Sequence, residues 1–417
     1  MSTPTMRTAL PYRLCWLAVL GAFVGLCLSD TAATAAAPPA AAPSAATPSA
    51  ATPMAAAPIG PSLPRSSSAA VVPGVALHFP RDYGAHPQFG IEWWYLTGWL
   101  RTAQHQPLGF QITFFRVRTG LEDSNPSAFT PRQLLIAHAA ISDPARGRLW
   151  EDQRIRREGL GLAQADVGDT HVWMDEWRLQ RHDGAASVGA SSAGPAHSGD
   201  VYVVHVSADD FGFDLSAATD AAPMLNGDAG YSQKGPEPRS ASYYYSQPQL
   251  RVRGSVTRNG HRQSVTGEAW LDHEWASQYL DPAAAGWDWV GLNLADGSAI
   301  MAFEIRDRSG RPYWAAGTLR DAHGRTHTFG PDQVAFTATR RWRSPRTGVL
   351  YPVAERLRIG TRQLQLQPLL DDQEFDARLT SDAIYWEGAV TVSAAGKQPV
   401  GRGYLELTGY GSPLSLR

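Results

Sequence analysis

The sequence predicts an all-β protein made of two consecutive antiparallel β-barrels. Many short runs alternate apolar and polar residues with a period of two, which is typical of strands. The 417 residues include 14 Trp, 14 Tyr and 13 Phe, which strands favour, while 39 Gly and 30 Pro suit the turns between strands. Beyond residue 30, no run keeps a helical period with capping residues at its ends. A barrel with a sandwich-like companion would fit the same strand count.

The first 30 residues have the pattern of a secretory signal peptide. Arg7 and Arg13 precede an apolar run over residues 14–28, and small residues follow it. The run is short for a membrane span, although an uncleaved N-terminal anchor is the alternative. We therefore expect an exported protein, either periplasmic or secreted.

The segment after this leader predicts a linker. Residues 31–72 are almost entirely Ala, Pro, Ser and Thr, which bury little surface and favour a flexible, partly extended chain. We expect ordered structure from about Val75. Both cysteines, Cys15 and Cys27, lie in the leader, so a processed chain would contain no disulfide and no thiol nucleophile.

The strands can be predicted in order along the rest of the chain. In residues 90–100, Trp93 and Tyr95 fall on one face and Glu92 and Trp94 on the other. Further alternating runs are residues 110–114, 134–142, 201–206, 211–213, 249–257, 264–275, 287–294, 300–306, 313–319, 385–392 and 403–409. Several are apolar on both faces, which suits barrels with a filled interior and a partner sheet outside. We place the first barrel at residues 73–278 and the second at 279–417, with a hairpin turn at Asp296-Gly297.

One run concentrates the residues that could carry chemistry. In WLDHEW, residues 270–275, His273 and Trp275 share one face of a strand, while Asp272 and Glu274 share the other. Burial beside aromatic walls could move the pKa of such a group toward the working pH, as acid catalysis requires. The alternative is a structural network, in which a buried His hydrogen bonds to a carboxylate.

A second candidate lies in the run EWWY, residues 92–95. Glu92 stands in an otherwise apolar strand, and a buried carboxylate needs a partner, which Arg116 or Arg118 could supply. His138 is a lone His in an apolar strand, where a core role is the alternative to a ligand role. Tyr245, in a run of three tyrosines, could line a cavity mouth or simply pack.

Other function classes find little support in the chain. The formal charge is −2, from 37 Lys and Arg against 39 Asp and Glu, which argues against nucleic acid as a partner. No G-x-S-x-G, Walker A or G-x-G-x-x-G motif follows a predicted strand. Asp272, His273 and Glu274 alternate between faces, so a single metal ion cannot easily bind all three. We expect no metal ion and no cofactor.

Several motifs together resemble a known family. They are EWWY at residues 92–95, HAAISD at 138–143, LDHEW at 271–275, WDW at 287–289, WEG at 386–388 and GYLELTGY at 403–410. These runs resemble the AttH group of the carotenoid 1,2-hydratase (hydroxyneurosporene synthase) superfamily, often described as secreted hydrolases. The resemblance implies two consecutive lipocalin-like barrels. His273 and Trp275 match the His-x-Trp of the hydratases, which act on long apolar polyenes, whereas AttH-type proteins are secreted and sometimes linked to ABC-type permeases.

Three functions of different classes follow as hypotheses. The first is hydration or hydrolysis of an apolar, isoprenoid- or lipid-like molecule by acid catalysis, in which Asp272 or His273 donates the proton and Trp rings stabilise a carbocation. The second is a lipid carrier without chemistry that works with an ABC-type export system. The third is a secreted glycosidase that pairs carboxylates such as Glu92 and Glu274. The predicted catalytic residues are His273, Asp272 and Trp275, and the predicted ligand-binding residues are Glu92, Trp93, Trp94, Tyr245, Trp287 and Trp289.

Overall fold

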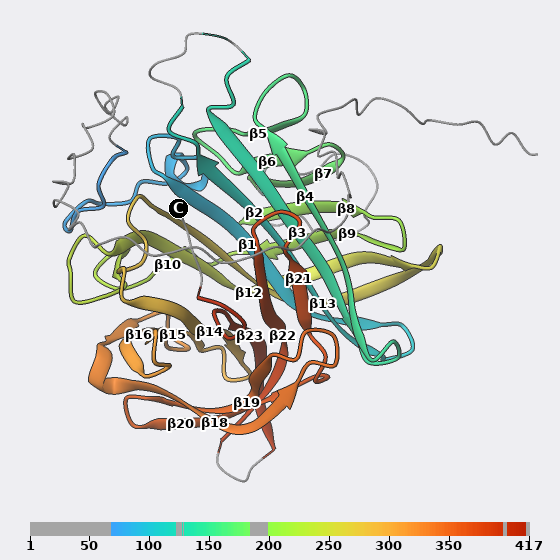
Figure 1. The fold of residues 1–417 in the computed structure, drawn as a ribbon. Helices are drawn as coiled ribbons and strands as arrows, with labels where there is room; N and C mark the ends of the chain where they lie inside the picture. Colours follow the sequence, from blue (N-terminus) through green and yellow to red (C-terminus); the bar gives the residue numbers. More distant parts are fainter. Residues whose placement is uncertain (1–67, 122–126, 128, 184–198, 395–397, 414–417) are drawn as a thin grey trace, which may run out of the picture. The chain divides into compact units, whose positions relative to one another are not determined.

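The computed structural model describes residues 68–121, 127, 129–183, 199–394 and 398–413. Apart from two short 3-10 turns, Arg81–Tyr83 and Pro331–Gln333, every regular element in these ranges is a β-strand. The strands form two antiparallel sheets, which confirms the predicted all-β fold of two lipocalin-like barrels (Figure 1). No helix in the described ranges is long and apolar enough to span a membrane. The predicted signal peptide and most of the predicted linker lie outside the described residues.

The first sheet contains thirteen strands and forms most of a barrel. Its hydrogen-bonded order is β4-β3-β2-β1-β13-β12-β9-β8-β7-β6-β5, and β10 and β11 also pair with β12. The strands are β1 (Ile91–Thr102), β2 (Pro107–Arg118), β3 (Gln133–Asp143), β4 (Arg148–Arg157), β5 (Ala163–Ala165), β6 (His171–Met174), β7 (Trp177–Asp183), β8 (Asp200–Ser207), β9 (Phe211–Thr219), β10 (Met224–Leu225), β11 (Tyr231–Gln233), β12 (Ala241–Arg258) and β13 (His261–Ala276).

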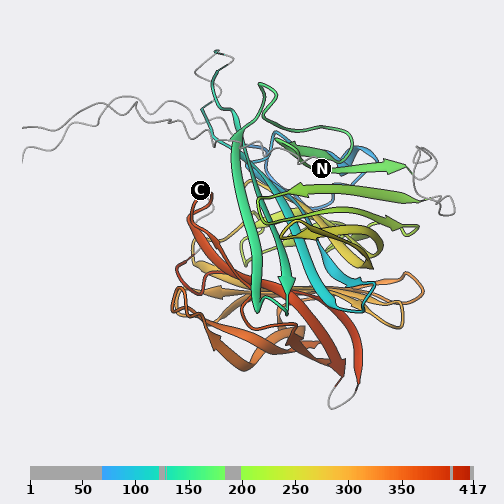
Figure 2. The same ribbon diagram turned by 90° about the vertical axis from the view of Figure 1, so that its right-hand side faces the viewer.

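The second sheet contains ten strands and curls around a core of its own (Figure 2). Its order is β17-β16-β15-β14-β23-β22-β20-β19-β18, and β21 pairs with β22. The strands are β14 (Ala284–Leu294), β15 (Ala299–Asp307), β16 (Pro312–Arg320), β17 (Thr326–Phe329), β18 (Val334–Arg343), β19 (Leu350–Ile359), β20 (Arg362–Pro368), β21 (Glu374–Ala377), β22 (Ala383–Ala394) and β23 (Pro399–Leu407). The Asp296-Gly297 turn joins β14 to β15, as predicted.

Both sheets present apolar side chains on two sides, which explains the strands that lack a polar face. One core fills the first barrel and another fills the second. A third apolar cluster takes residues from both sheets, among them Tyr95 of β1, Trp270 of β13, Trp289 of β14 and Tyr404 of β23. Tyr95 and Trp270, on the outer face of β1 and β13, therefore pack against the second sheet rather than face water.

Packing of the chain begins slightly before the expected start near Val75. Val71 is buried, and the Ala69 amide donates to the Gln88 carbonyl at 2.9 Å. The Ser277 hydroxyl donates to the Ala69 carbonyl at 2.5 Å, which ties this segment to the end of β13. The end of the Ala/Pro-rich stretch thus packs against β12 and the end of β13.

Candidate functional site

The pairing of β1 with β13 sorts the predicted site residues into two groups. Tyr95 lies opposite Asp272 and Trp93 opposite Glu274, whereas Trp94 lies opposite His273. Directly opposed residues share a face of the sheet. His273 therefore points into the first barrel, and its neighbour Asp272 points toward the second sheet, as the strand alternation predicts.

His273 lies in a closed hydrogen-bonded cluster inside the first barrel. Its side chain is 0% exposed, its Nε2 lies 2.8 Å from Glu92 Oε1, and its Nδ1 lies 3.1 Å from the Tyr245 hydroxyl. Trp94 stacks on the His273 ring with a centroid distance of 4.6 Å. His86, whose ring stacks on Trp275 at 3.8 Å, contacts the same Glu92 oxygen through Nδ1 at 2.7 Å.

Glu92 is the charged centre of this cluster. The Arg116 Nε donates to Glu92 Oε2 at 2.8 Å, which confirms Arg116 as one of the two partners that the sequence offered. Burial alone would raise the pKa of Glu92, but Arg116 and hydrogen bonds from His273 and His86 hold it well below its usual range. Burial lowers the pKa of His273, whereas hydrogen bonds to Asp82 and Glu92 outweigh burial and raise the pKa of His86. The cluster is thus an ionised carboxylate surrounded by donors.

The same residues could hold a metal ion by residue type. One ligand atom from each of His86, Glu92 and His273 lies within 4.8 Å of the others. Both histidine nitrogens are hydrogen bonded to Glu92 Oε1, and the positively charged guanidinium of Arg116 lies beside the carboxylate of Glu92. That charge would repel a cation, so the geometry favours the hydrogen-bonded network over a metal site.

Asp272 occupies a contrasting environment between the sheets. Its carboxylate accepts hydrogen bonds from the Tyr244 hydroxyl at 2.6 Å, the Ser246 hydroxyl at 2.5 Å and the Trp270 indole N–H at 2.7 Å. The Trp289 indole N–H donates to the Tyr244 hydroxyl at 3.0 Å and extends this network into the second sheet. Burial outweighs these hydrogen bonds and raises the pKa of Asp272 to about 7.

Three further carboxyl groups share this layer. Glu274 pairs with Lys234 at 2.8 Å, yet burial still raises its pKa. Glu387 of β22 lies directly opposite Glu406 of β23. Burial and the charge of Glu406 raise the pKa of Glu387 well above its usual range, and burial raises the pKa of Glu406 to about 7. Like charges on opposed residues disfavour double ionisation, so Glu387 and Glu406 are not both ionised.

Aromatic rings adjoin these carboxyl groups. The rings of Trp93 and Tyr279 lie 4.9 Å apart and those of Tyr279 and Trp287 lie 5.7 Å apart, both edge to face. All three side chains are half-buried, and so is Glu406. Lys234 lies over the rings of Phe303 and Tyr244, at 4.2 and 4.8 Å.

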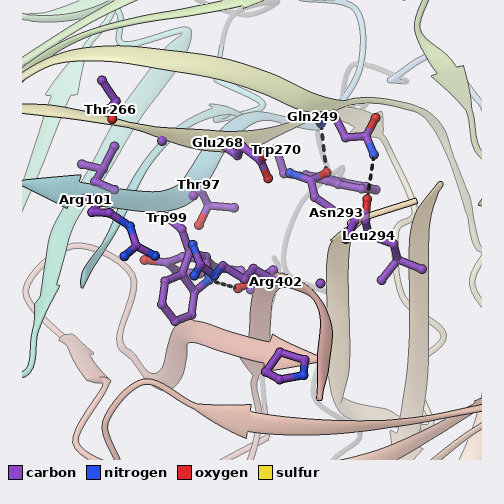
Figure 3. A pocket seen from close by; sticks show the side chains of 18 of the residues that line it. Thr97, Trp99, Arg101, Gln249, Thr266, Glu268, Trp270, Asn293, Leu294 and Arg402 are labelled. Carbon is purple, nitrogen blue, oxygen red and sulfur yellow. Dashed lines mark hydrogen bonds between the residues drawn. The ribbon is translucent and has the colours of Figure 1, made fainter. Parts of the chain in front are cut away.

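A cavity of about 710 Å³ opens between the two sheets at the other end of the same strands. Figure 3 shows its walls, which include Trp99, Arg101, Trp270 and Arg402. The Trp270 indole that lines this cavity is the one that donates to Asp272. The volume falls within the range of small-molecule binding sites, about 300–1,000 Å³.

The structure brings the predicted residues together in two places rather than one. His273, Trp275, Glu92, Trp94 and Tyr245 meet inside the first barrel, and Asp272, Trp93, Trp287 and Trp289 lie on the side of the second sheet. Glu92 and Glu274, which a glycosidase would use as a pair, lie on opposite faces of the first sheet. His138 is buried and hydrogen bonds to the hydroxyls of Tyr385 and Thr380, at 2.9 and 2.8 Å.

Two residues of these clusters, His86 and Lys234, were not predicted from the sequence. His86 lies between a 3-10 turn and β1, and Lys234 follows the three-residue strand β11. Neither stands in a run with a readable period, so nothing local signals its role. Lys234 could have been suspected only from the need of a buried Glu274 for a cation.

Comparisons with known proteins agree with this architecture. A family model described as AttH-like matches residues 70–410. The crystal structure of an AttH protein from Nitrosomonas europaea is 50% identical with a TM-score of 0.74, covering 82% of this chain and 99% of that one. Kievitone hydratase from Nectria haematococca is 16% identical with a TM-score of 0.59, covering 84% and 97%, and shares the fold. A search of curated proteins gave no match. By the extent of the family match and the 50% identity, the chain belongs to the AttH-like family.

Proposed function

We propose that the protein binds an apolar, isoprenoid- or lipid-like molecule between its two barrels and acts on it by acid catalysis, with Asp272 as the proton donor. The observation that carries this proposal is a carboxyl group, Asp272, that is buried between the sheets with hydrogen bonds only from the neutral groups of Tyr244, Ser246 and Trp270, so that burial raises its pKa to about 7. A carboxyl group with this pKa is largely protonated just below neutral pH and can donate its proton there. Trp270 and Trp289 stand beside it in the same network.

Hydration of a carbon–carbon double bond would use these groups in a balanced sequence. The Asp272 proton forms a C–H bond with the π electrons and leaves a carbocation, which neighbouring indole faces stabilise. Water then forms the C–O bond, and its released proton returns to the Asp272 carboxylate. The apolar walls limit competing water, which favours protonation of carbon. Hydrolysis would use the same donor on a leaving-group oxygen.

Two further considerations support this assignment. Kievitone hydratase is named for hydration and has the same fold, so the fold is compatible with this reaction. The signal-peptide pattern of residues 1–30 supports export, and we include in the proposal that the protein acts outside the cytoplasm, with an ABC-type permease as partner.

A carrier without chemistry is the second candidate. One specific observation favours it: His273, the family's His-x-Trp histidine, is enclosed and hydrogen bonded at both ring nitrogens. A histidine held in this way has no free nitrogen to offer a ligand.

Mass spectrometry separates the two candidates. The full chain is incubated with a lipid extract of an AttH-containing bacterium, and bound and released molecules are compared with those from Asp272→Asn. Catalysis predicts a product heavier by one water, or two hydrolytic fragments, which Asp272→Asn fails to form. An unaltered ligand, retained equally by both proteins, would favour the carrier.

A further inference from the structure

The cavity between the sheets carries an unusual set of charges at its walls. Arg101 of β1, Glu268 of β13 and Arg402 of β23 are its charged lining residues, and all three are exposed. Within the described ranges, neither arginine has an ion-pair partner within 4 Å. The three charges influence one another, because burial and the charge of Arg101 lower the pKa of Arg402 while Glu268 opposes them.

The remaining walls combine three aromatic rings with polar and small aliphatic residues, and hydrogen bonds hold several of them in place. The Trp99 indole N–H donates to the Gly403 carbonyl at 2.9 Å, which links β1 to β23. Arg402 lies 5.1 Å from the centre of the Trp99 ring. On the other side of the cavity, β12 has a bulge at Gln249. The backbone N–H of Gln249 donates to the side-chain oxygen of Asn293 at 2.9 Å, and its side-chain Nε2 donates to the Ser298 carbonyl at 3.0 Å. These hydrogen bonds fix Trp99 and Gln249 before a ligand arrives, so that binding has mainly the two arginine side chains left to order.

These features together indicate what the cavity binds. Two arginines and one glutamate leave a net charge of +1, which matches one monovalent anion better than a dianionic phosphate. Guanidinium groups bind carboxylates through paired hydrogen bonds, and Leu100, Leu294 and the exposed edges of the largely buried Trp99 and Trp270 form the apolar part of the walls beside them. We propose that this cavity binds the carboxylate of an apolar acid, with Arg101 and Arg402 holding the head group and the apolar body lying along Trp99 and Trp270.

This inference deepens the proposed function by naming the ligand class, and it rests on that proposal for the apolar nature of the ligand. The register of β1 and β13 supports the connection. Arg101 lies opposite Thr266, and Tyr95 lies opposite Asp272, six residues further along. Six residues of strand span about 20 Å, so a long-chain acid anchored at the arginines would extend toward the level of Asp272.

Calorimetric titration of the full chain tests the inference with three probes: decanoate, methyl decanoate and decyl phosphate. Decanoate should bind at least about tenfold more tightly than its uncharged ester, because the ester cannot form charge-assisted hydrogen bonds. The double variant Arg101→Gln/Arg402→Gln should bind decanoate as weakly as the ester, with ester binding unchanged. Glu268→Gln should strengthen decanoate binding, since it removes the opposing charge.

Control variants test whether the loss of decanoate binding is specific to the arginines of the cavity. Arg356→Gln changes an exposed arginine on β19 outside the cavity and should leave decanoate affinity unchanged. Equal affinity for acid and ester, or tighter binding of decyl phosphate, would overturn the inference, as would failure of decanoate to bind. Asp272→Asn should bind decanoate like the parent chain. If decanoate fails to bind while Asp272 still titrates near pH 7 and is needed for turnover, the ligand class is wrong and the proposed function stands. If decanoate binds but Asp272 proves dispensable for turnover, the ligand class stands and the proposed function is wrong.

Discussion

Strand β13 separates two buried clusters that differ in how their charge is balanced. On the barrel side, Arg116 and two histidines surround Glu92, and its pKa falls well below the usual range. On the other side, Asp272 receives hydrogen bonds only from neutral groups, and its pKa rises to about 7. Burial acts on both carboxyls in the same direction. A full positive charge within hydrogen-bond distance decides which of them stays ionised.

The comparison assigns different roles to adjacent residues. The His273 side balances its charges and satisfies its hydrogen bonds, which suits a network that holds the barrel together. The Asp272 side keeps a carboxyl of raised pKa next to aromatic rings, one of which, Trp270, also lines the cavity, and this arrangement suits chemistry on a ligand. Substitutions on the two sides should therefore differ in their effects on stability and on the titration of Asp272.

The largest effect should come from breaking the ion pair inside the barrel. Glu92→Ala leaves the buried guanidinium of Arg116 without its carboxylate, and such a loss costs about 3–5 kcal/mol. Denaturant unfolding at pH 7 measures the free energy. Asp272→Asn is the matched control, because it replaces a carboxyl that has no cationic partner with a neutral amide of similar size, and it should cost far less. Equal losses in both variants would mean that the two sides do not differ in charge.

The second effect is a dependence of stability on pH. Because the pKa of Asp272 is raised in the folded state, this carboxyl binds more protons in the folded than in the unfolded chain between about pH 4 and pH 7. The contribution of Asp272 to the free energy of unfolding should therefore fall as the pH rises through this window, whereas buried His138, whose pKa is lowered to about 3, acts in the opposite sense. One pKa unit corresponds to about 1.4 kcal/mol, so the loss should amount to a few kcal/mol.

Glu304 and Glu406, whose pKa values are also raised to about 7, act in the same sense. Asp272→Asn should therefore remove from the pH dependence of the free energy of unfolding the contribution of Asp272 alone. Thermal or denaturant unfolding at pH 5, 6, 7 and 8 measures it. A variant with the same slope as the parent chain would show that Asp272 does not titrate in this range.

A smaller effect is expected from His273. His273→Ala removes the partner of Glu92 Oε1 and of the Tyr245 hydroxyl, and unsatisfied buried groups cost about 1–3 kcal/mol. Arg116 and His86 still hold Glu92, so the loss should be smaller than for Glu92→Ala. His273→Gln should recover part of it by restoring one hydrogen bond. Loss of turnover at unchanged stability would instead give His273 a direct role in the reaction.

Much of this arrangement could be predicted from the sequence, because it follows from strand alternation. The run LDHEW placed Asp272 and His273 on opposite faces, and the isolated Glu92 predicted a cation, found as Arg116. The strands β18 to β20 went unpredicted, because charged residues interrupt the apolar pattern of β18 and β19, and the short β20 buries only two leucines. The opposition of Glu387 and Glu406 depends on the register between β22 and β23, which no local pattern fixes.

The smallest and most specific effect concerns two neighbouring tyrosines of β12 that face opposite sides. Tyr244 donates to Asp272, whereas Tyr245 contacts His273. Tyr245→Phe removes one buried hydrogen bond, at a cost of about 1 kcal/mol, whereas Tyr244→Phe removes two, because the Tyr244 hydroxyl also accepts from the Trp289 indole. Only Tyr244→Phe removes a donor that stabilises the ionised form of Asp272, so it should raise the Asp272 pKa further, by about one unit. Infrared titration of the protonated carboxyl band, assigned by its loss in Asp272→Asn, measures this shift. Tyr245→Phe should leave that titration unchanged, and equal shifts in the two variants would mean that β13 does not isolate one cluster from the other.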